Sequence, residues 1–109
     1  MKYLITESQL DKAIFRYLDN QNFIQIEDKK NIYFVNSEND EYAQIRYDKN
    51  DGWCGIYDEL IYEISRFFSL DNFDSEEIIG KWVENTLNMS VTGTSLMIIL
   101  FVPIVENTL

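Results

Sequence analysis

The chain has 109 residues with 19 acids, nine bases and no histidine, which gives a formal net charge of −10. This composition argues against a nucleic-acid binder, which needs clustered Lys and Arg, and it removes the side chain that most often transfers protons near neutral pH. Hydrophobic residues make up 46% and aromatic residues 15%, which excludes a disordered acidic tail and predicts a single domain over residues 1–109.

The first half of the chain predicts a helix followed by short strands. Thr6 and Gln9 form a capping box, in which Thr6 is the N-cap and Gln9 reaches back to it. The apolar stripe of the helix comprises Leu10, Ala13, Ile14, Tyr17 and Leu18. Strands are predicted at residues 23–26, 32–35, 42–47 and 53–57, with polar turns between them. Connections this short favour an antiparallel meander.

The second half predicts two helices and a final strand. Asp58 is expected to cap the first helix, whose apolar face comprises Leu60, Ile61, Ile64, Phe67 and Phe68. Asp74 or Ser75 is expected to cap the second helix, whose buried side comprises Ile78, Ile79, Trp82, Val83, Thr86 and Leu87. Residues 96–102 are apolar without alternation, which predicts a strand covered on both faces.

These elements together predict an α+β fold. It consists of an antiparallel meander of three to four strands plus a C-terminal strand, packed with three helices. The apolar segment at residues 96–105 is much shorter than the roughly 20 residues that span a bilayer, so no membrane contact is expected.

Cys54 is the only thiol in the chain, and no histidine is present to convert it to a thiolate. We interpret it as a small buried hydrophobic residue beside Trp53. A lone cysteine without a secretion signal predicts a cytoplasmic protein. No zinc spacing, phosphate-binding glycine loop or nucleophile motif occurs, so the sequence predicts no catalytic residue, no metal and no cofactor.

The acids are concentrated in residues 58–85, where eight acids face two bases, a net of −6. Glu59 and Glu63 are spaced i, i+4 on one predicted helix, and Glu77 and Glu84 are seven residues apart on the next. Like charges at i, i+4 destabilise a helix by a few tenths of a kcal/mol, about 0.2–0.5. We therefore predict that these four glutamates bind a basic partner protein; the alternative is that the charge only keeps the protein soluble.

Residues 2–10 (KYLITESQL) resemble the start of uncharacterised small acidic proteins of tailed phages and metagenomes, and residues 79–85 (IGKWVEN) resemble their late helix. The resemblance implies a phage or prophage origin and carries no catalytic residue. Because small acidic phage proteins often inhibit host defence, it also favours an inhibitor.

Our main expectation is a non-enzymatic acidic protein-binding module, most concretely a phage-encoded inhibitor of a basic nucleic-acid-handling host protein. No direct nucleic-acid contact is expected, and a phage-encoded protein would act in the host cytoplasm. Two alternatives stay open. One is a structural or assembly protein that forms a homodimer through its hydrophobic C-terminal strand, and the other is a metal-dependent enzyme that uses carboxylates alone.

Overall fold

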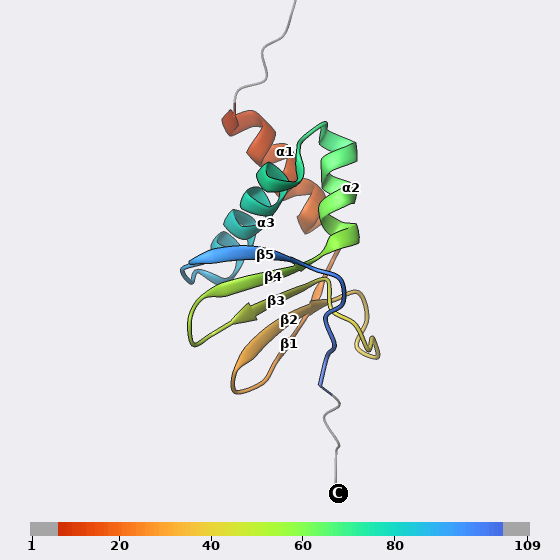
Figure 1. Ribbon diagram of the computed structural model, residues 1–109, viewed down its shortest axis with the longest axis vertical. Coiled ribbons are helices and arrows are strands. Elements are labelled where there is room, and N and C mark those ends of the chain that lie inside the picture. The colour runs from red at the N-terminus through yellow and green to blue at the C-terminus, as the bar shows by residue number, and fades with distance from the viewer. Residues whose placement is uncertain (1–6, 104–109) are drawn as a thin grey trace, which may run out of the picture.

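The computed structural model describes residues 7–103 and shows three helices and one five-stranded sheet (Figure 1). The helices are α1 (Glu7–Asp19), α2 (Asp58–Phe68) and α3 (Asn72–Leu87). The strands are β1 (Ile24–Glu27), β2 (Asn31–Val35), β3 (Ile45–Asp48), β4 (Trp53–Tyr57) and β5 (Gly93–Met97). They lie in the order β1-β2-β3-β4-β5, and the first four form the expected antiparallel meander. The α+β fold class is therefore confirmed.

The fifth strand makes the sheet mixed. β5 pairs parallel to β4, with Trp53 opposite Gly93 and Tyr57 opposite Met97. A parallel pair needs a long crossover connection, and α2 and α3 together supply it. As a result β5 forms one edge of the sheet and β1 forms the other.

The helices cover one face of the sheet, and the main core lies between the two layers (Figure 1). Successive residues of a strand point to opposite faces, so Ile32 and Phe34 of β2 face the helices while Tyr33 and Val35 face away. From α3, Trp82 packs against Phe34 with ring centroids 5.4 Å apart. Its indole nitrogen donates to the carboxylate of Asp19 at 2.9 Å, which joins α3 to the end of α1.

The chain that follows β5 covers part of the opposite face. Leu100 is buried there against Tyr33, Val35 and Ala43. The Ala43 N–H donates to the Leu100 carbonyl at 2.8 Å, and the Val102 N–H donates to the Glu41 carbonyl at 2.9 Å. In Figure 1 this segment turns away from β5 and runs past the ends of the other strands. The second, smaller core therefore depends on residues beyond the last strand.

The prediction that residues 96–102 form a strand covered on both faces was wrong. The strand is Gly93–Met97, and Ile98, Ile99 and Phe101 are exposed. Because Leu100 points into the sheet, its immediate neighbours Ile99 and Phe101 point outward. Ile98, directly after the end of β5, is exposed as well.

The starts of two helices differ from the predictions. α2 begins at Asp58 itself, and Tyr57 occupies the N-cap position without a side-chain hydrogen bond. α3 begins at Asn72, and its N-cap is Asp71, whose carboxylate accepts the Asp74 N–H at 2.8 Å. The capping predictions for Asp58 and for Asp74 or Ser75 were therefore displaced by one to four residues.

Other local predictions also need adjustment. Ala13, Phe67 and Thr86 were assigned to apolar helix faces but are exposed, and the N-cap Thr6 lies outside the described residues. β3 begins at Ile45 rather than at residue 42, because Tyr42 pairs in an isolated bridge with Phe101 instead.

Candidate protein-binding site

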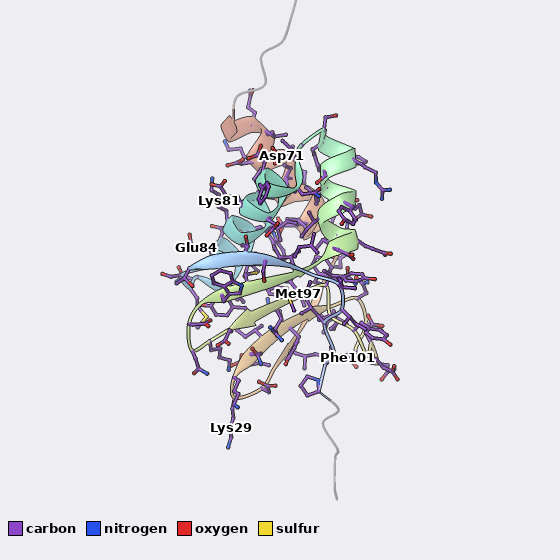
Figure 2. The ribbon with its side chains drawn as sticks, in the orientation of Figure 1. Lys29, Asp71, Lys81, Glu84, Met97 and Phe101 are labelled. Carbon is purple, nitrogen blue, oxygen red and sulfur yellow. The ribbon has the colours of Figure 1, made fainter. Side chains whose placement is uncertain are left out.

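The four predicted glutamates lie on two separate surfaces. Glu59 and Glu63 line a cavity of about 460 Å³ beside α2. Glu77 and Glu84 line a different cavity of about 200 Å³, between α3 and the start of β5. Figure 2 shows Glu84 on the flank of α3 that faces away from α2. The fold thus brings the glutamates together in pairs and does not form one acidic face from all four.

Both glutamates of α3 already have partners within the protein. Glu77 pairs with Lys81 at 3.8 Å, one turn along an exposed helix surface. Glu84 accepts the Val91 N–H at 2.8 Å and so holds the turn between α3 and β5. Substitution of Glu84 would therefore disturb the fold as well as the surface charge.

The glutamates of α2 face a longer groove. Their cavity adjoins a second cavity of about 360 Å³, and the two share Gln44 and Tyr57 in their linings. We call the two cavities together the Tyr57 groove. Burial, followed by the nearby Glu59 and Asp58 carboxylates, raises the pKa of Tyr57, so its hydroxyl stays protonated and can donate a hydrogen bond near neutral pH.

Large apolar side chains are exposed at the far end of this groove. Tyr42, Ile98, Ile99 and Phe101 have exposed fractions of 48%, 78%, 45% and 63%. We call these four residues the C-terminal patch. Tyr42, Ile98 and Ile99 line the groove itself, and the Phe101 ring packs against the Tyr42 ring in a tilted arrangement with centroids 5.4 Å apart (Figure 2 labels Phe101). Contiguous exposed apolar side chains on a small protein mark an interaction surface more often than scattered ones do.

Two acids at the rim of the patch have different roles. The Asp40 carboxylate accepts the N–H groups of Asn36 and Ser37 and the Ser37 hydroxyl at 2.9–3.0 Å. These hydrogen bonds, led by the one from the Ser37 hydroxyl, lower the pKa of Asp40, and they hold the loop that carries Tyr42. Glu41 is exposed beside it, and its main chain anchors the C-terminal segment.

Thiol chemistry does not fit the interior of the molecule. Cys54 is buried in the main core, and burial raises the pKa of its thiol to about 12. A thiol with such a pKa is almost fully protonated near neutral pH and is a poor nucleophile. Within residues 7–103 no group of three or more Cys, Asp or Glu residues is arranged to hold a metal ion. The carboxylate-only enzyme stays an untested prediction.

The sequence reasoning missed the C-terminal patch. No local signal distinguished it, because residues 98–102 are all apolar, although only Leu100 among them is buried in the structure. An apolar run of this kind was read as a buried strand. Its outward positions were exposed only because no element among the described residues covers that side of the segment.

No helix in the described part of the chain is both long and apolar enough to cross a membrane. We compared the chain with protein-family models, curated proteins and solved structures, and none of them matches it. The resemblance to small phage proteins therefore stays a prediction.

Proposed function

We propose that this protein is a non-enzymatic protein-binding module, and that its interface is the C-terminal patch together with the Tyr57 groove. The observation that carries the proposal is the exposure of four large apolar side chains directly beside a groove lined with carboxylates. Interfaces of this type combine an apolar centre with a charged rim, and aromatic residues are enriched at the centre.

The charges around the groove indicate the chemistry of the partner. Asp40, Glu41, Glu59 and Glu63 line it, and Arg66 is the single base among the lining residues. With a chain net charge of −10, this surface attracts a partner that presents Lys or Arg around an apolar side chain. Such complementarity mainly raises the association rate, and the buried apolar side chains supply most of the affinity.

The most specific form of the proposal is a phage-encoded inhibitor that binds a basic nucleic-acid-handling host protein. Its support is the net charge and the resemblance of residues 2–10 and 79–85, rather than the geometry of the groove. A homodimer through the C-terminal strand remains the main alternative.

Removal of the apolar centre tests the proposal. We expect the double variant Ile98→Ser/Phe101→Ser to lose the partner captured by the wild-type protein from host extract, because these side chains would become buried on binding. The matched control is Phe73→Ser, which removes an apolar side chain that is 82% exposed at the start of α3. Capture of the same partner at equal strength by the patch variant would contradict the proposal.

Charge reversal provides a second measurement on the same captured partner. The double variant Glu59→Lys/Glu63→Lys should bind more weakly, and its binding should depend less on salt concentration than that of the wild type. Unchanged affinity and unchanged salt dependence would remove the basic partner from the proposal and leave only the apolar contact.

A further inference from the structure

β5 is an edge strand whose outer side is not paired with another described strand. It pairs with β4 on its other side. Its sequence, GTSLM, contains no charged residue and no proline. An edge strand of this type presents unpaired N–H and C=O groups that can hydrogen-bond another chain.

One side of this edge is bordered by α3. The helix approaches β5 closely at Gly80, where an added Cβ would lie only 2.8 Å from Thr94 Cγ2. Next to this contact, Glu77, Lys81 and Glu84 line the 200 Å³ cavity with residues 91–94. Figure 2 labels Lys81 and Glu84 on this flank of α3. A chain lying along β5 would therefore direct alternate side chains toward the flank of α3 that carries Glu77, Lys81 and Glu84. Next to them, Glu76 already accepts a hydrogen bond from the Thr94 hydroxyl at 3.3 Å.

The other side of the edge is bordered by an aromatic ring. The Trp53 indole lies across β5 over Gly93, because a Cβ at position 93 would come within 2.3 Å of the ring. Its Nε1 donates to the Ser95 hydroxyl at 3.0 Å, yet the residue remains 44% exposed. A chain lying along β5 would direct its remaining side chains toward this apolar ring.

We propose that the free edge of β5 binds an extended segment of a partner protein as a sixth strand. The segment alternates basic side chains, which face Glu77 and Glu84, with apolar side chains, which face Trp53. Main-chain hydrogen bonds to β5 supply the affinity, and the alternation of side chains supplies the specificity. This site is separate from the C-terminal patch and does not depend on the function proposed for it.

A single extended segment fits this edge better than a second copy of the chain. Two copies pairing through β5 would bring together two copies of the α3 flank that carries Glu77 and Glu84, so like charges would approach each other. Each copy also carries a net charge of −10, which opposes the pairing. An isolated strand meets neither obstacle.

The probe is a synthetic octapeptide that alternates Lys and Val, titrated against the full chain while tryptophan fluorescence is recorded. We expect saturable binding with a change in Trp53 emission, and no binding of an octapeptide that alternates Glu and Val. A Lys/Val peptide whose backbone amides facing β5 are N-methylated should bind far more weakly, because those amides can no longer donate hydrogen bonds to the β5 carbonyls. Equal binding of the methylated peptide would overturn the proposal.

A charge variant locates the site. Glu77→Lys should weaken binding of the Lys/Val peptide about fivefold, whereas Glu38→Lys, an exposed acid on the loop after β2, should leave it unchanged. Ile98→Ser/Phe101→Ser should also retain peptide binding, which separates this site from the C-terminal patch. Equal weakening by Glu77→Lys and Glu38→Lys would show nonspecific charge attraction and overturn the proposal. A dimer in sedimentation that the Lys/Val peptide dissociates would show that a second copy occupies this edge, and it would also overturn the proposal.

Discussion

The two edges of the sheet are protected to different degrees. β1 carries the exposed polar residues Gln25 and Glu27, and Glu27 pairs with Lys49 of the turn after β3. β5 has no charge, and it is bordered by the Trp53 ring and the groove under α3. Because charges on an edge strand oppose pairing with other chains, β1 is the less favourable edge for an added strand and β5 the more favourable one. This difference between the edges is the reason for placing the proposed extended segment at β5 rather than at β1.

The largest effect is expected where α3 meets the open edge. Gly80→Val would force the helix away from Thr94 and should lower the free energy of unfolding by about 1–3 kcal/mol, measured by urea denaturation. Adding Thr94→Ser removes the methyl group that the new side chain strikes and should recover part of the loss. If Gly80→Val lost no stability, or if adding Thr94→Ser recovered none of the loss, this contact would not be what sets the α3–β5 distance.

An intermediate effect is expected when the protection of β1 is removed. Glu27→Val deletes the exposed pair with Lys49, which contributes only about 0.2–1 kcal/mol, so stability should change little. The new edge is β-branched and uncharged, and light scattering should detect self-association that rises with protein concentration. Glu38→Val, with the same charge change on an exposed loop, should stay as dispersed as the wild type. Equal association of both variants would point to net charge rather than to the edge.

The smallest effect concerns the hairpin turn that follows β1. The Asp28 carboxylate accepts the N–H groups of Asn31 and Lys30, both at 2.8 Å, and these hydrogen bonds, the one from Asn31 most, lower its pKa. A lowered folded-state pKa stabilises the protein above the unfolded-state value of about 4, and this stabilisation is lost as the pH falls through the lower folded-state value. Asp28→Asn should therefore be slightly less stable than the wild type near pH 7, as measured by urea denaturation.

The same comparison at acid pH provides the control for Asp28. The wild type and Asp28→Asn should converge once the carboxylate is protonated in both the folded and the unfolded chain. The difference should be small because the carboxylate is only partly buried, so solvent screens its interactions. If the stability difference were the same at every pH, the substitution would destabilise the protein for a reason other than the loss of the charge.

The fold was predictable where local signals and tertiary contacts agree. The strand at residues 53–57 was located without error, since Gly52, with φ of 77°, ends the turn before it and α2 follows at once. Within the predicted strand at residues 42–47, Ala43, Ile45 and Tyr47 are buried and alternate with polar or exposed neighbours, as expected of a half-buried strand.

The errors arose where distant segments compete for the same residues. Tyr42 was expected in β3 but pairs with Phe101, and the run at residues 96–102 could be assigned to a strand only by knowing what covers it. In the same way, i, i+4 spacing places Glu59 beside Glu63, but no local rule could show that α3 directs Glu77 and Glu84 to another surface. The two grooves are products of packing between elements and have no signature within any one of them.

The two tryptophans of the chain report on different places. Trp82 is buried in the main core with its N–H bonded to Asp19, whereas Trp53 lies half-exposed across β5. A soluble quencher such as iodide should therefore reduce the fluorescence of Trp53 and leave that of Trp82 nearly unchanged. The quenched component is the red-shifted emission of Trp53, and the unquenched component is the blue-shifted emission of Trp82. The protein thus carries its own pair of optical probes, one for unfolding of the core and one for occupation of the edge, and neither requires a label.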